Sequence, residues 1–143
     1  MTVALTSIWE TGWNTPLLEK DLWSFLVNEF QLDGGIWMTP VSGIHLRDDS
    51  GIHERASMAD VLTELNLTAV FLDQDGDEAL RDFVHPASCV YVAGSTLASA
   101  MAYKRPGDVS VRIETPGIAG GLWSHQSACI ALYDRQAKSW PQP

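Results

Sequence analysis

Residues 113–135 read IETPGIAGGLWSHQSACIALYDR. The segment opens with a short apolar stretch, reaches Pro116 and Gly117, passes through Gly120 and Gly121, and continues into a stretch with helical character. Glycine adopts backbone conformations that other residues avoid, and it lets a ligand approach the main chain closely. A strand, a glycine-rich loop and a helix in this order predict either a ligand-binding loop or a turn that only redirects the chain.

The rest of the chain alternates between strand-like and helix-like segments, a pattern typical of an α/β domain with a parallel sheet covered on both faces. The predicted strands are 3–9, 36–41, 67–73, 89–93 and 109–113, and the predicted helices are 16–30, 58–66, 77–84 and 124–136. Residues 42–55 are polar and are predicted to form a surface loop. We therefore expect one domain over residues 1–136, with five to six parallel strands flanked by helices, and a tail over residues 137–143.

Two helices carry specific expectations. The first has an apolar stripe made of Leu17, Leu18, Leu22, Phe25, Leu26 and Val27. The second follows Ser57, which is predicted to be its N-cap.

Composition limits the function classes. The chain has 143 residues, of which 45% are hydrophobic and 19% charged, as in a folded globular domain. Its net charge of -9 repels nucleic acids at long range, so binding to RNA would need a local basic patch. Cys89 and Cys129 lie in apolar segments and are expected to be reduced core residues. No signal peptide or membrane-spanning run is recognisable, so we expect a cytoplasmic protein without membrane contact.

Ligands of open parallel sheets bind at the carboxyl ends of the strands. Three predicted loops lie there, at residues 72–76, 94–96 and 113–123. The chain has no G-x-x-x-x-G-K-[ST] motif, and its glycine-rich loop follows the last strand rather than the first. These observations argue against a P-loop and against a conventional dinucleotide site.

The order of segments in the second half resembles the SPOUT, or α/β-knot, methyltransferases, nearest the branch that methylates RNA ribose hydroxyls. Residues 65–135 carry the resemblance, through HPASCVYVAGS at 85–95 and VSVRIETPGIAGGLWSHQSACIALYDR at 109–135. The positions that fit the family's pattern are Gly94, Ile113, Pro116, Gly117, Leu122, Ala128 and Ala131. The first half matches only at Asn14 and at Lys20, six positions later, where the family has an arginine.

The resemblance implies a carboxyl-terminal trefoil knot and a glycine loop that binds S-adenosylmethionine. The residues that it places around this cofactor are Leu72, Gly94, Ser95, Ile113, Glu114, Gly117 and Leu122. It also implies methyl transfer to RNA (tRNA or rRNA), at a ribose 2′-oxygen, and a homodimer whose surface includes Ala128, Ile130 and Leu132. An alternative is a knotted dimer that binds the cofactor, RNA or a protein and no longer transfers methyl groups. A further alternative is an unrelated α/β domain.

Three positions depart from the family's pattern, and all three concern side chains that act on RNA. Lys20 stands in place of the arginine, Thr96 in place of a glutamate, and Trp123 in place of an asparagine. A lysine is a point charge that must lose its proton before it can act as a base. The catalytic candidates are Lys20 and Asn14, with Ser124 at the start of the last helix, where a helix cap is the simpler interpretation.

The remaining polar residues favour structural roles. His45 and His53 lie among acidic residues without the spacing of a helical ligand pair, so no metal site is expected. His85 is interpreted as a cap at a helix end, and His125, beside the proposed cofactor loop, is the histidine best placed for function. The alternating aspartates of 73–77 do not complete a calcium loop, and they are interpreted as a turn that enters a helix.

Overall fold

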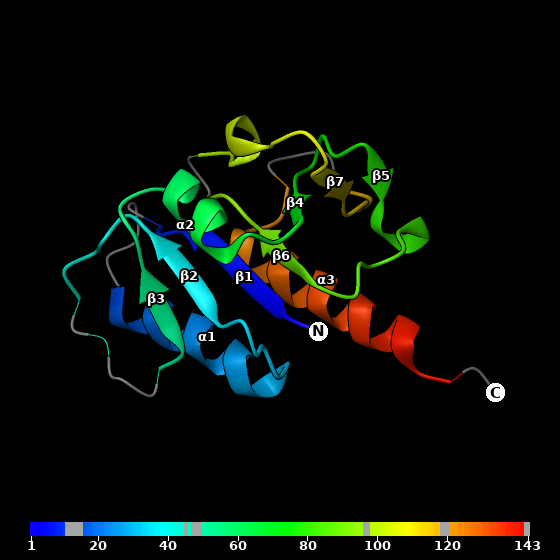
Figure 1. The fold of residues 1–143 in the computed structure, drawn as a ribbon. Helices are drawn as coiled ribbons and strands as arrows, with labels where there is room; N and C mark the ends of the chain where they lie inside the picture. Colours follow the sequence, from blue (N-terminus) through cyan, green and yellow to red (C-terminus); the bar gives the residue numbers. More distant parts are fainter. Residues whose placement is uncertain (11–15, 45, 47–49, 96–97, 118–120, 142–143) are drawn as a thin grey trace.

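A computed structural model describes residues 1–10, 16–44, 46, 50–95, 98–117 and 121–141. Seven strands form one sheet in the order β3-β2-β1-β6-β4-β7-β5, and neighbouring strands are parallel throughout (Figure 1). The strands are β1 (Val3–Ile8), β2 (Ile36–Thr39), β3 (Ile52–Glu54), β4 (Ala69–Leu72), β5 (Glu78–Ala79), β6 (Cys89–Val92) and β7 (Val109–Arg112). The helices are α1 (Pro16–Glu29), α2 (Met58–Leu65) and α3 (Ser124–Ser139), with 3-10 turns at Leu80–Asp82 and Met101–Tyr103.

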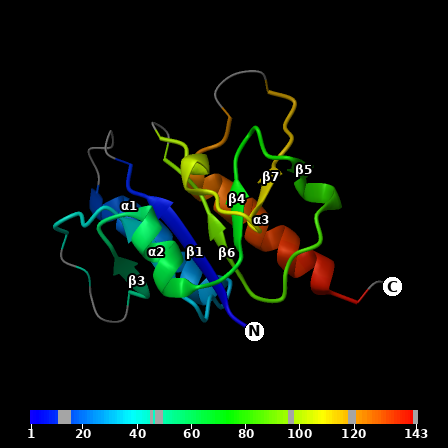
Figure 2. The same ribbon diagram turned by 45° about the horizontal axis from the view of Figure 1, so that its top comes forward.

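The helices cover both faces of the sheet, with α1 and α3 on one side and α2 on the other (Figures 1 and 2). Alternate residues of a strand point to opposite faces. Leu5 and Tyr91 therefore pack in the cluster with α1 and α3, while Ala4 and Val90 pack in the cluster with α2. The central strands β1 and β6 are buried on both faces, which explains the continuous apolar sequence of β6. In β1 the buried Thr6 and Ser7 hydroxyls donate to the main-chain carbonyls of Trp37 and Gly94.

The predicted fold class, a single α/β domain with a parallel sheet flanked by helices, is confirmed. The predicted strand number was too low, because two short edge strands were missed. Residues 52–54 of the predicted surface loop form β3 beside β2, and residues 78–79 of a predicted helix form β5 beside β7. Segments of two or three residues contain no measurable period, and hydrogen bonds to a neighbouring strand stabilise them instead.

The helix predictions were correct for α2 and only partly correct for the others. Ser57 caps α2 by accepting a hydrogen bond from the Asp60 N–H at 3.1 Å. Helix α3 extends to Ser139, three residues beyond the predicted end at 136. In α1 the expected apolar stripe is largely exposed, with Leu17, Leu18 and Phe25 each more than half exposed. The face that packs on the sheet carries Leu26, which belongs to the predicted stripe, together with Glu19 and Trp23, which do not. Because α1 is apolar around much of its circumference, the spacing of its leucines did not identify the buried side.

Both cysteines are free. Burial raises the pKa of the Cys89 and Cys129 thiols, which keeps them protonated and unreactive at neutral pH. Within the described part of the chain, no helix combines the length and hydropathy needed to cross a membrane.

Candidate functional site

A cavity of about 790 Å³ lies at the carboxyl ends of β4, β6 and β7. Figure 2 shows these strand ends at the same edge of the sheet. The cavity is lined by residues 72–74, 93–95, 98–99, 112–115, 117, 121–124 and 127. The loops after three strands and the first turn of α3 therefore enclose one space, at the edge where open parallel sheets bind their ligands.

All seven residues predicted to surround a cofactor line this cavity: Leu72, Gly94, Ser95, Ile113, Glu114, Gly117 and Leu122. The parallel pairing of β4 with both β6 and β7 explains why they meet, since it brings the ends of three strands distant in sequence to one edge. The structure thus shows the proximity of these residues. Their contact with a cofactor remains a prediction.

Asp73 is held in a fixed position at the base of the cavity. Its backbone N–H donates to the Val111 carbonyl at 3.1 Å, which extends the pairing of β4 with β7 by one residue. Its carboxylate accepts from the Ser99 hydroxyl at 3.0 Å and from the Asp75 N–H at 2.9 Å. The aspartates therefore form a turn, as predicted, but the turn leads into β5 rather than a helix. Among the described residues, no group of acidic, histidine and cysteine side chains could hold a metal ion.

Charged side chains give the cavity an acidic character. Asp73 and Glu114 line it together with one basic residue, Arg112. The Arg112 guanidinium lies 3.1 Å from the Glu114 carboxylate and also donates to the main-chain carbonyls of Gly76 and Asp77. This lining suits a ligand that carries positive charge as well as polar groups.

The glycines of the cavity have different roles. A Cβ atom on Gly94 would lie 2.3 Å from the Ala98 carbonyl oxygen, so this glycine lets the chain fold back on itself after β6. Of the residues that the structure describes, a Cβ atom on Gly117 would meet only Thr115, at 3.8 Å from its hydroxyl oxygen. Gly117 therefore leaves space in the cavity, whereas a side chain at position 94 would collide with the backbone.

Ser124 lines the cavity and connects it to two buried carboxyl groups. Trp123 is the N-cap residue of α3 and Ser124 is its first residue, so the interpretation of Ser124 as the cap was wrong by one position. The Ser124 hydroxyl donates to Glu10 Oε1 at 3.3 Å. The Glu19 carboxylate in turn accepts from the Glu10 N–H at 3.0 Å and from Trp23 Nε1 at 3.2 Å.

Both glutamates were missed by sequence reasoning. Glu10 is 6% exposed and Glu19 is 2% exposed. Burial raises the pKa of the Glu19 carboxyl, while its hydrogen bonds from Glu10 and Trp23 act in the opposite direction. The available signal was an acidic residue within the apolar segments SIWE and PLLEK.

Of the other catalytic candidates, the structure describes Lys20. Lys20 is not among the lining residues, and its ammonium lies 3.6 Å from the Asp21 carboxylate. Asn14, Thr96 and His45 lie outside the described residues. His125 holds α3 against α1, because its Nε2 lies 3.1 Å from the Leu22 carbonyl and its ring packs edge-on against Trp23.

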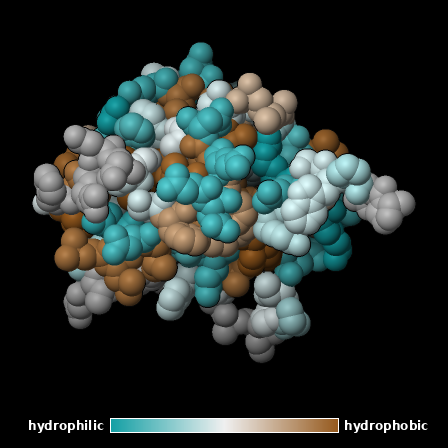
Figure 3. Space-filling model, turned by 90° about the horizontal axis from the view of Figure 1, so that it is seen from below, coloured by the Kyte–Doolittle hydropathy of each residue, from teal (hydrophilic) through white to brown (hydrophobic). Residues whose placement is uncertain are grey.

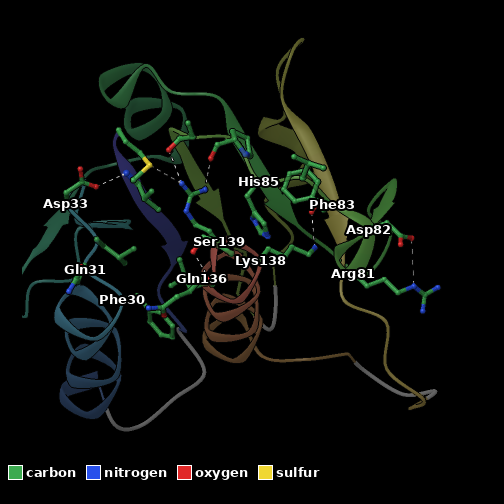
Figure 4. A pocket seen from close by; sticks show the side chains of 18 residues that line it. Phe30, Gln31, Asp33, Arg81, Asp82, Phe83, His85, Gln136, Lys138 and Ser139 are labelled. Atoms are coloured by element: carbon green, nitrogen blue, oxygen red, sulfur yellow. Dashed lines mark hydrogen bonds and ion pairs between the residues drawn. The ribbon is translucent and has the colours of Figure 1, made fainter. Parts of the chain in front are cut away.

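A second cavity, of about 940 Å³, lies at the opposite ends of the strands (Figure 4). It is lined by residues that precede β1, β2 and β6 and by the last turns of α3. Two of its basic side chains bind the protein's own main chain: Lys138 donates to the carbonyls of Leu80 and Phe83, and Arg135 donates to those of Pro86 and Ala87. Arg81 pairs with the carboxylates of Asp82 and Glu114. The side chains around this cavity therefore form a structural junction, which joins the last turns of α3 to the loops that line the cavity.

His85 is the centre of that junction and not a helix cap, because the segment before it forms a 3-10 turn instead of the predicted helix. Its Nδ1 lies 2.7 Å from the Tyr91 hydroxyl, and its Nε2 lies 2.7 Å from Asp134 Oδ2. Burial lowers the pKa of His85, and the hydrogen bond and charge of Asp134 oppose this effect. The neutral imidazole thus joins β6 to α3.

Comparisons with known proteins agree with the fold. No family model and no curated protein matches the chain. Among solved structures, the SpoU methyltransferase AviRb from Streptomyces viridochromogenes has a TM-score of 0.73 at 15% identity, over 96% of this chain and 61% of AviRb. AviRb in complex with the cofactor AdoMet has a TM-score of 0.70 at 17% identity, over 98% of this chain and 61% of that one.

A third structure, from a study of 2-OH methylation of C/U34 on tRNA, has a TM-score of 0.73 at 10% identity and covers 96% of this chain and 90% of its own. The chain thus spans about three fifths of AviRb and most of the tRNA-related protein. These likenesses confirm the resemblance to the SPOUT methyltransferases at the level of fold.

Proposed function

We propose that this chain, which has the fold of the SpoU and TrmH RNA methyltransferases, transfers a methyl group from S-adenosylmethionine to RNA. The acceptor that we propose is a ribose 2′-hydroxyl. The observation that carries the proposal is the single cavity that brings together all seven predicted cofactor residues. A solved neighbour of this fold, AviRb, has AdoMet bound.

The residues of the cavity fit this cofactor in size, polarity and charge. A volume of about 790 Å³ lies within the range of roughly 300–1,000 Å³ that small-molecule sites occupy. Leu72, Ile113 and Leu122 provide apolar surface for an adenine ring, and Asp73 provides a carboxylate for a cationic ligand. S-adenosylmethionine supplies an electrophilic methyl group when bound, while the chain positions the acceptor and excludes water.

Lys20 remains a candidate for favouring the loss of the acceptor's proton through its positive charge, in place of the family's arginine. We expect Lys20→Ala to lower turnover about 100-fold and to leave the cofactor affinity within about threefold of wild type, because Lys20 does not line the cofactor cavity. Lys20→Arg should restore part of the turnover. Steady-state kinetics with tritiated S-adenosylmethionine would measure both quantities. Unchanged turnover in Lys20→Ala would remove Lys20 from the mechanism.

We further propose that the protein acts as a homodimer. Apolar side chains on α1 and α3 remain exposed in the single chain, including Phe25, Ile130 and Tyr133. Figure 3 views the molecule from the side of these helices and shows apolar patches among polar ones. Ala128 and Leu132, which were expected on the dimer surface, are buried against the chain's own sheet and cannot provide it.

The experiment that tests the function is titration of the purified protein with S-adenosylmethionine, followed by a methyl-transfer assay on unmodified tRNA and ribosomal RNA transcripts. We expect micromolar binding, tritium incorporation into RNA, and a sedimentation mass of twice the 15.7 kDa chain. Binding without transfer would favour the alternative of a binding protein. The departures from the family's pattern at residues 96 and 123 favour the same alternative. Absence of binding by the folded protein would contradict the assignment of the cavity.

A further inference from the structure

We propose that Glu10, acting through Ser124, accepts the proton that the acceptor hydroxyl loses during methyl transfer. The proposal rests on the proposed function, because it assigns a proton acceptor to the same cavity. The contact that carries it becomes visible only in the tertiary structure.

The contact between Ser124 and Glu10 carries the argument. Ser124 lines the cavity, and its hydroxyl donates to Glu10 Oε1 at 3.3 Å. The two residues are 114 positions apart, so the contact joins the end of β1 to the start of α3. A serine hydroxyl that donates one hydrogen bond retains two lone pairs, which can accept a proton from a group within the cavity.

The surroundings of Glu10 shield it from solvent. Glu10 is 6% exposed, and its backbone N–H is hydrogen-bonded to the Glu19 carboxylate at 3.0 Å. From α1, the charged group that faces Glu10 is Glu19, whose pKa is raised chiefly by burial. From α3, the ionisable residue next to Ser124 is His125, whose ring contacts Trp23. The hydrogen bond from Ser124 therefore links this buried carboxylate to the cavity.

The proposed step balances in atoms and electrons. The O–H bond of the acceptor breaks, and its electron pair forms the new bond to the methyl carbon. The carbon–sulfur bond of the sulfonium breaks, with its electrons passing to sulfur. The acceptor's proton moves to Ser124 Oγ as the Ser124 proton moves to Glu10, so the carboxylate ends protonated and the hydroxyl of Ser124 is regenerated.

The test compares Glu10→Gln, Glu10→Asp and Ser124→Ala with wild type in the methyl-transfer assay on RNA transcripts. Glutamine matches the shape of glutamate but cannot take the proton. We expect Glu10→Gln to lower turnover about 100-fold and to keep the cofactor affinity within about threefold. Glu10→Asp should recover part of the turnover. Glu64→Gln, in an exposed ion pair on α2, is the control and should match wild type.

A measurement without cofactor checks the contact itself. The urea midpoints of Ser124→Ala, Glu10→Ala and the double variant should be non-additive, because both single variants remove the same hydrogen bond. Additive midpoints would overturn the contact. Wild-type turnover in Glu10→Gln, or equal losses in Glu10→Gln and Glu10→Asp, would overturn the relay while the proposed function stands. A wild-type protein that transfers no methyl group to RNA would overturn the proposed function and the relay together.

Discussion

Replacing Gly117 with tryptophan is expected to lower the affinity for S-adenosylmethionine about 100-fold, equal to about 2.7 kcal/mol. Gly117 lines the cavity, and among the described residues a Cβ at this position would meet only the Thr115 hydroxyl oxygen, at 3.8 Å. The indole would therefore fill the volume that the cofactor needs without displacing the backbone. Calorimetric titration would measure the affinity.

The matched control for this prediction is Gly117→Ala. A single methyl group fits the space, so this variant should bind within about threefold of wild type. The thermal midpoints of both variants should stay close to the wild-type value, because no core contact changes. Wild-type affinity in Gly117→Trp would show that the cofactor does not occupy this part of the cavity, whereas a large drop in the midpoint would show that Gly117 serves the backbone.

Replacing His85 with alanine is expected to lower the free energy of unfolding by about 3 kcal/mol. The variant leaves a void and removes hydrogen bonds to Tyr91 and Asp134 that join β6 to α3. His53, which is exposed and stacks on Trp37, offers a matched control. His53→Ala should lower stability by less than about 1 kcal/mol. Urea denaturation would measure both variants, and equal effects would contradict the role of His85 as a junction.

The same histidine sets an expected pH dependence. Burial lowers the pKa of His85 in the folded chain below its ordinary value of 6.5. At a pH between the lowered pKa and 6.5, His85 is therefore protonated more often in the unfolded chain than in the folded one. The His85 contribution to stability is therefore complete above about pH 6.5 and declines as the pH falls through the lowered pKa. Glu19, with a raised pKa, contributes in the opposite sense, and its contribution declines as the pH rises. The difference between wild type and His85→Ala across pH 5 to 7 isolates His85, and a constant difference would contradict this account.

Local patterns were sufficient for the central strands and for helix α2. Apolar runs predicted the central strands, and the cap Ser57 predicted the start of α2, because these features depend on neighbours in the sequence. The edge strands β3 and β5 were not predictable, since two or three residues become a strand only when β2 or β7 offers hydrogen bonds. The fit between helix and sheet decided which face of α1 is buried, and the spacing of the leucines did not indicate that face.

The sequence by itself determined that the chain is an α/β domain and which glycines and apolar residues lie at the strand ends, because strand pattern and glycine placement are local properties. Only the tertiary structure decided that the seven residues predicted to surround a cofactor share one cavity, since the parallel register of β4, β6 and β7 brings those strand ends together. The structure likewise decided that Glu10 meets Ser124 and that His85 meets Asp134. Contacts between residues so far apart follow from how α3 packs on the sheet, and no spacing along the sequence encodes them.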